Sequence, residues 1–181
     1  DYFRLLFARI GKQHCHQCGK PISQMSASDV INQVLTLPEE SKIVILAPLV
    51  NRKKGTFADL LESLRNKGYV RAMIDGVMVR LDEDIELAKT QMHTIKVVID
   101  RVTVKEENKD RIAQDVEKGL KESFGELEVE IANFEEVGTE KLIHYSEHMA
   151  CFDCKISFEP LEPLSFSFNS PKGACPACDG L

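Results

Sequence analysis

All six cysteines of this 181-residue chain occur as three Cys-x-x-Cys pairs, namely Cys15/Cys18, Cys151/Cys154 and Cys175/Cys178. Two thiolates separated by two residues can bind one metal ion, because the turn between them directs both sulfurs inward. A tetrahedral site with four thiolate ligands needs a second such pair. The first pair lies near the N-terminus and the other two near the end of the sequence. The spacing therefore predicts that metal joins the two ends, with a separate domain between them.

The sequence allows two ways of combining these pairs. The second and third pairs together have the spacing of a four-cysteine zinc site. The first and second pairs share a local pattern and flank the intervening domain, which would bring them close in space. The pair left over would bind a second ion with help from residues outside the chain or from His14, His16 or His148. One or two structural Zn²⁺ ions are therefore expected.

Zinc is favoured over disulfides as the role of these thiols. The first residues, DYFRLLFARIGK, lack the basic start, apolar run and cleavage site of a signal peptide. Small secreted scaffolds also carry cysteine more densely along the chain. Reduced, metal-bound thiolates are typical of the cytoplasm, which is the predicted location. No apolar run approaches the roughly 20 residues that cross a bilayer, so no membrane contact is expected.

A zinc ion with four thiolate ligands has no open position for water, so the expected role of the metal is structural. A second motif argues for catalysis: His144, Glu147 and His148 have the H-x-x-E-H spacing of inverted zinc peptidases. That chemistry requires a helix with both histidines on one face, whereas this segment reads as a strand. The sequence therefore favours a non-catalytic module.

The net charge of −6 argues against a protein that binds nucleic acid over its whole surface. One local basic patch remains, Arg52, Lys53 and Lys54, in a predicted loop just before a helix. The exposed N–H groups of a helix start can bind anions. This loop lacks the G-x-x-x-x-G-K-[ST] pattern of a nucleotide-binding loop, so it is either a solvated basic loop or a phosphate contact.

The elements that must position these residues follow from hydrophobic periodicity. Helices are expected at residues 2–10, from Ser26 or Ser28 to about 37, and around 57–64 and 112–120, the last ended by Gly125. Strands are expected at 42–50, 70–75, 77–81, 95–104, 127–131 and 142–145, the second and third forming a hairpin about Asp75-Gly76. The alternation of Leu127, Val129 and Ile131 with glutamates predicts one solvated face on that strand.

This order of elements predicts an α+β, or mixed α/β, fold with a mixed or antiparallel sheet. It is a sheet-and-helix sandwich inserted between zinc-knuckle flanks. Residues 1–25 would hold the end of a helix and the first knuckle, 26–145 the inserted domain, and 146–181 the remaining zinc-finger segment.

Two arginines lie on predicted strands, where the pattern alone does not distinguish them from ordinary surface residues. Arg71 alternates with Val70, Ala72 and Ile74, so it should point away from what these three bury. Arg101 has the parity of buried residues on its own strand, which would require a bulge or the end of the sheet. Arginine is a preferred anchor for acidic partners, because its guanidinium fork pairs with two carboxylate oxygens at once.

The whole chain resembles the first ATP-binding region of the UvrA family, the damage-sensing subunits of the bacterial UvrABC excision nuclease. The resemblance is carried by the first knuckle and by YFRLLFARIG, IVILAPLVNRKKGTF, GYVRAMIDG, HTIKVVIDRVTVK and, most specifically, LEPLSFSFNSPKGACPACDGL. In that family the looped-out α/β domain binds UvrB, and zinc modules join it to the ATPase body. The resemblance implies that Arg71 and Arg101 pair with acidic side chains of UvrB.

The resemblance also implies a parent protein that is a dimeric ABC-class ATPase acting in DNA repair on damaged DNA. The ATP-binding machinery of such a protein would lie outside this chain, so no catalysis is expected from it. The first hypothesis is therefore a UvrB-binding module with its base fixed by zinc. The alternative is a DNA-contacting zinc-ribbon module in which Arg52, Lys53 and Lys54 hold phosphates.

Overall fold

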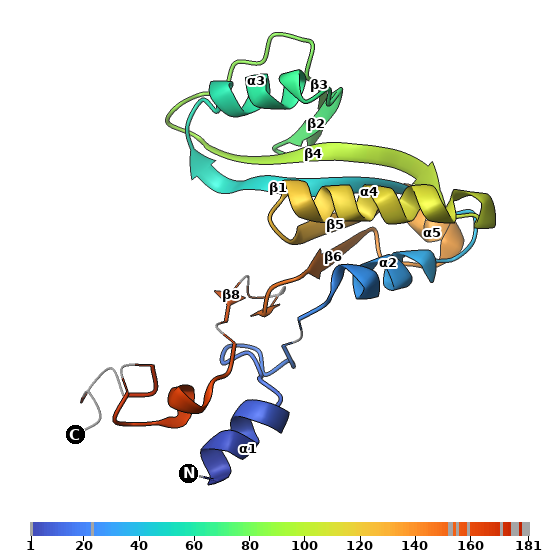
Figure 1. Cartoon of the computed structure of the whole chain (residues 1–181). Helices are drawn as coiled ribbons and strands as arrows, with labels where there is room; N and C mark the ends of the chain where they lie inside the picture. Colours follow the sequence, from blue (N-terminus) through green and yellow to red (C-terminus); the bar gives the residue numbers. More distant parts are fainter. Residues whose placement is uncertain are drawn as a thin grey trace. The chain divides into compact units, whose positions relative to one another are not determined.

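The computed structural model describes residues 2–22, 24–151, 154, 156–158, 160–170, 172–174 and 178 (Figure 1). The chain divides into two compact units. The larger unit is Met25–Glu147, and the smaller one combines Asp1–Gln24 with His148–Leu181. That segments 1–25, 26–145 and 146–181 have separate roles stays a prediction.

The larger unit is built on one six-stranded sheet with strand order β3-β2-β4-β1-β5-β6. Its strands are β1 (Lys42–Lys54), β2 (Arg71–Ile74), β3 (Val77–Arg80), β4 (Met92–Thr103), β5 (Glu126–Ile131) and β6 (Leu142–Ser146). Every neighbouring pair is antiparallel. The predicted α+β sandwich is therefore confirmed, with a wholly antiparallel sheet.

Helices α2 (Ala27–Leu35), α3 (Ala58–Asn66) and α4 (Lys109–Glu122) pack on one face of this sheet, and the short α5 (Phe134–Val137) adds to it. One core lies between α2, α4 and strands β1, β4 and β5. A second core lies between α3 and strands β1, β2 and β4. Helix α2 begins at a capping box, in which Ser26 and Asp29 exchange side-chain and backbone hydrogen bonds.

The position of Arg101 is decided by a bulge in β4. Ile45 lies opposite Asp100 but the next residue, Leu46, lies opposite Val98, so Ile99 is an extra residue in β4. An extra residue reverses the alternation beyond it. Arg101 therefore faces away from the helices, opposite Val44, and it is exposed. Of the two alternatives that the sequence left open for Arg101, a bulge or the end of the sheet, the structure shows the bulge.

The predicted solvated face of β5 is wrong at Glu128, whose residue exposure is only 3%. Its carboxylate contacts the Lys96 ammonium and accepts a hydrogen bond from His144 Nε2 at 2.7 Å. Burial raises the pKa of Glu128, but the bonds and charges of His144 and Lys96 outweigh it and hold the pKa below its usual value. Side chains of β4 and β6 thus replace water around this carboxylate.

The predicted loop at Arg52, Lys53 and Lys54 is also corrected. These residues continue β1 as a two-stranded ribbon with β4, in which Lys53 lies opposite His93 and Lys54 opposite Met92. Arg52 has a left-handed φ of 48° at a register shift, so the chain bends there without leaving the ladder. The helix that follows begins only at Ala58, so the basic residues belong to a strand.

The prediction that Val70 is buried together with Ala72 and Ile74 is wrong for Val70, which is 56% exposed. Ala72 and Ile74 are buried as expected. Val70 precedes β2, so the strict alternation of a paired strand does not apply to it. Arg71, the first residue of β2, is exposed as the alternation predicts.

His93 joins the β2–β3 turn to the segment before β4. Its Nδ1 lies 2.7 Å from Asp75 Oδ2 and its Nε2 lies 3.0 Å from the carbonyl oxygen of Ala88. Both neighbours accept hydrogen bonds only, so the ring satisfies both when it is protonated and donates twice. The hydrogen bond that His93 donates to Asp75, and then the one it donates to Ala88, raise the pKa of His93, although burial lowers it. The same bond to His93 lowers the pKa of Asp75.

These shifts predict the pH dependence of stability. A histidine whose pKa is raised by folding stabilises the fold, and this stabilisation is complete below the ordinary histidine pKa near 6.5. The stabilisation is lost as pH rises through the pKa of the folded state. A lowered carboxyl pKa stabilises the fold above its ordinary value near 3.8 and is lost as pH falls. The melting temperature of the native chain should therefore fall from pH 6 to 8 more than that of His93→Gln. Equal slopes in thermal unfolding would contradict the double hydrogen bond.

The smaller unit contains α1 (Tyr2–Ile10), the paired strands β7 (Ala150–Cys151) and β8 (Ile156–Ser157), and a short 3₁₀ turn, η2 (Pro163–Phe166). The ring centroids of Phe7 and Phe166 lie 5.8 Å apart, which joins α1 to η2. The predicted helix at residues 2–10 is confirmed. Among the described residues, no helix combines the length and the hydropathy that crossing a membrane requires.

Candidate metal centre and partner-binding surface

The first Cys-x-x-Cys pair lies on a tight loop. His14 and Pro21 form an antiparallel bridge, and the amide of Ile22 donates to the carbonyl oxygen of Gln13 at 2.8 Å. Within this loop the amide of Gly19 donates to the carbonyl oxygen of Cys15, also at 2.8 Å. Gly19 has φ 71°, a conformation that glycine adopts at least cost. The turn thus returns the chain so that Cys15 and Cys18 project to the same side.

The second pair is positioned by the β7–β8 ladder. Cys151 lies opposite Ile156, and the amide of Phe158 donates to the carbonyl oxygen of Met149 at 2.7 Å. Cys15 and Cys151 are buried to 2% and 4% exposure and share a small core with Ile22. This apolar shell keeps water from the sulfurs of the two buried cysteines.

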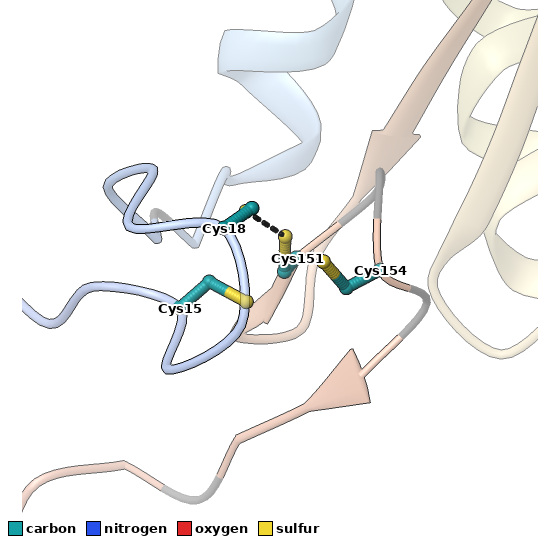
Figure 2. A group of neighbouring side chains, drawn as sticks. All are labelled: Cys15, Cys18, Cys151 and Cys154. Atoms are coloured by element: carbon teal, nitrogen blue, oxygen red, sulfur yellow. Dashed lines mark hydrogen bonds between the residues drawn. The ribbon is translucent and has the colours of Figure 1, made fainter.

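The four sulfurs of these two pairs converge on one point, as Figure 2 shows. Their Sγ atoms all lie within 4.8 Å of one another, and those of Cys18 and Cys151 are 3.4 Å apart. Four sulfurs about 2.3 Å from a tetrahedral zinc ion would be about 3.8 Å from one another. The arrangement therefore fits one ion with a closed shell of four ligands.

The pKa values of the thiols differ strongly within this group. The backbone N–H of Cys18, together with smaller contributions, lowers the pKa of Cys15 to about 6. Burial, followed by the neighbouring sulfurs of Cys18 and Cys15, raises the pKa of Cys154 to about 12. Four sulfurs this close cannot all carry charge by themselves, and a divalent cation would favour the thiolate form of each.

The structure thus brings together the first and second of the three predicted pairs. Cys175 lies outside the described residues, and Cys178 is an exposed free cysteine. Among the described residues, the group close enough to hold a metal contains cysteines only. His14 bonds to the carbonyl oxygen of Lys12, and the ring of His16 packs against Phe158.

Arg71 and Arg101 are brought to one place in the larger unit. Strand β2 pairs with β4 only at Ala72–Ile74, so residues 98–103 of β4 have no strand on that side within the fully described stretch 24–151. A hollow of about 210 Å³ lies at this step in the sheet. It is lined by both arginines and by residues that the sequence did not single out, including Tyr69, Asp100 and Lys118. These residues come together because β2 pairs with only part of β4. The hydrophobic pattern along a single strand does not predict that arrangement.

Comparison with known proteins decides the family. The family model described as the UvrA interaction domain matches residues 25–133, which is more than half of the chain and lies within the larger unit. The chain belongs to the UvrA interaction domain family. The resemblance drawn from the sequence is therefore confirmed.

Relatives of this UvrA interaction domain extend over both units. The UvrABC system protein A of Helicobacter pylori strain J99 is 65% identical over 181 residues. The proteins of that name from Streptomyces avermitilis and Bacillus subtilis are 49% and 45% identical over the same length. Each match covers 100% of this chain but only 18–19% of the relative. The chain therefore spans about a fifth of the length of these proteins.

The sulfur geometry predicts which thiols retain metal. Cys154→Ser removes one of four ligands and should lose the ion, because a closed site depends on its full ligand set. Cys178→Ser should retain that ion, because Cys178 is not among the four sulfurs. Metal content per chain, measured by atomic emission after purification, checks both variants. Cys154→Ser is also combined with Cys175→Ser and Cys178→Ser, because those two cysteines are predicted to bind a second ion. Metal retained by that triple variant would contradict the assignment of ligands.

Proposed function

We propose that this chain is the UvrB-binding module of a UvrA protein in nucleotide excision repair. The observation that supports it is the shared hollow of Arg71 and Arg101. Both side chains are exposed, and the ion pairs described within 24–151 include neither. By contrast, Arg80 pairs with Asp82 and Arg111 with Asp100. Two guanidinium groups available at one hollow suit a partner that presents two carboxylates.

The physical advantage of this arrangement is that two guanidinium groups lie at one hollow. Each guanidinium forms two parallel hydrogen bonds with a carboxylate, which fixes geometry as well as charge. The hollow lets the partner's acidic side chains leave water when they bind, so each ion pair is stronger than on a flat surface. Acidic residues of UvrB are the ligands that this chemistry selects.

We propose zinc as the ion of the four cysteines, since soft thiolates in tetrahedral geometry suit it. Its role is structural: it fixes Cys15, Cys18, Cys151 and Cys154, on segments from both ends of the chain, in one unit. The third pair, Cys175/Cys178, remains proposed as a ligand pair for a second zinc. Reduced thiolates suit the proposed cytoplasmic location.

The remaining activities belong to the proposed parent protein. It would be a dimeric ABC-class ATPase that binds ATP and damaged DNA, with the catalytic groups in segments other than this chain. The chain itself would contribute the partner surface and no catalytic residue.

Loss of the two arginines tests the proposal. Removing one partner of a buried, charge-paired contact costs about 2–5 kcal/mol. Arg71→Ala/Arg101→Ala should therefore abolish UvrB binding at micromolar concentration, as followed by titration calorimetry with the 181-residue chain.

A matched control removes two exposed cations elsewhere. Lys89→Ala/Lys141→Ala makes the same change of charge outside the hollow and should bind UvrB like the native chain. Unchanged binding by the arginine variant, or equal loss by the lysine variant, would exclude a specific role for the two arginines.

A DNA contact is the second candidate function, and the β1 ribbon favours it. Arg52, Lys53 and Lys54 are consecutive and exposed at its end, where a phosphate backbone can approach. Such contacts would hold DNA without reading its sequence.

Salt dependence tests this alternative. Replacing Arg52, Lys53 and Lys54 with Gln should reduce the slope of log K against log salt by about one unit for each lost phosphate contact. Fluorescence anisotropy with a labelled duplex measures the slope. An unchanged slope removes the DNA-contact assignment and leaves the UvrB proposal unaffected.

A further inference from the structure

We propose that the UvrB-binding surface extends from the arginine hollow into a groove between α3 and α4, where Phe124 contacts an apolar side chain on an acidic segment of the partner. This inference rests on the proposed function, because it adds a second contact region to the same partner. The family resemblance that points to Arg71 and Arg101 does not point to Phe124.

The groove is a built feature of the larger unit. Its volume is about 590 Å³, within the range of about 300–1,000 Å³ typical of ligand pockets. Part of β1 also lines it, and Figure 1 shows α3 and α4 as separate helices over the long β1–β4 ladder. The residues used below are Leu49, Leu60, Tyr69, Lys118, Lys121 and Phe124.

The groove is continuous with the arginine hollow. Tyr69 and Lys118 line both, and the Lys118 ammonium lies 4.8 Å from the centroid of the Tyr69 ring. The Tyr69 hydroxyl donates to Glu122 at 3.1 Å, and Lys67 contacts the same carboxylate. The carboxylate of Glu122 therefore already has a cationic partner and a hydrogen-bond donor within the chain. A partner bound at Arg71 and Arg101 would therefore contact Tyr69 and Lys118 as it extends into the groove.

Phe124 occupies a position that folding alone would give to another residue. Helix α4 ends with the amide of Gly125 donating to the carbonyl oxygen of Leu120 at 2.7 Å, so Phe124 is the residue just past the C-cap. That position takes φ 57°, which glycine or asparagine adopts at less cost. The prediction that Gly125 ends the helix thus misses the left-handed residue before it.

Exposure adds to this cost. Phe124 is 85% exposed although it is large and apolar. Strained residues persist where function requires them, and binding energy concentrates in aromatic and arginine side chains at the centre of an interface. An exposed aromatic ring in a groove that shares Tyr69 and Lys118 with the arginine hollow has this composition.

The charge around the groove selects the partner segment. Lys118 and Lys121 are exposed on its α4 side, whereas Glu122 is bound by Lys67 and Tyr69. Leu49 and Leu60 supply apolar surface between the two helices. An extended segment with carboxylates and one apolar side chain satisfies both features, and it is the same acidic chemistry that the arginines recruit.

The test separates folding from binding at one residue. Phe124→Asn removes the ring but suits the left-handed backbone, so the melting temperature should stay the same or rise. Its affinity for purified UvrB, measured by calorimetry with the 181-residue chain, should fall about ten-fold or more, as for an interface hot spot. Phe124→Tyr should restore native affinity, because it retains the ring.

The matched control is Met92→Asn, which removes an apolar side chain that is 55% exposed and does not line the groove. It should bind UvrB with native affinity. If Phe124→Asn binds like the native chain while Arg71→Ala/Arg101→Ala does not, the groove inference fails and the proposed function stands. If both variants bind like the native chain, both fail.

Two further outcomes are decisive. If Phe124→Asn lowers the melting temperature, Phe124→Gly replaces it, because glycine also adopts this backbone. Native affinity of that variant overturns the inference. A change in sedimentation that reports self-association, with UvrB binding unaltered, also overturns it, because the occupant would then be a second copy of this chain.

Discussion

The ladder between β1 and β4 is the constraint on which the rest of the larger unit depends. These are the two longest strands of the sheet, they lie at its centre, and they supply residues to both cores. Their backbone groups pair along most of their length, so neither strand can shift without exchanging its buried and exposed faces. The single extra residue at Ile99 makes that exchange locally. One core lies on each side of this point along β4.

The side chains proposed to bind the partner lie where the regular pairing ends. Arg101 faces outward only because of the bulge, and Arg71 is the first residue of the short β2. Because β2 covers only part of β4, the step in the sheet creates the hollow that both arginines line. Phe124 likewise lies where a regular element ends, directly after the C-cap of α4. The rigid ladder positions these groups, and the irregularities leave them accessible.

The two units use different sources of stability. The larger unit buries two apolar cores under three helices, whereas the described part of the smaller unit has one small core around Cys15, Ile22 and Cys151. A core of that size stabilises little by itself, so metal coordination would supply much of the folding free energy there. Coordination would also close the flanks from which the larger unit is looped out.

The sequence by itself determined the family, through the segments that resemble its members. It also determined the six strands and the main helices, because hydrophobic periodicity is a local property of the chain. Only the tertiary structure decided which cysteine pairs meet, because the residue spacing satisfied both alternatives equally. It also decided the burial of Glu128, which depends on Lys96 and His144 from other strands, and the strand conformation of Lys53, which depends on its neighbour His93. The pattern along one segment indicates which way a side chain points only where the alternation is unbroken, whereas its partners come from segments distant in sequence.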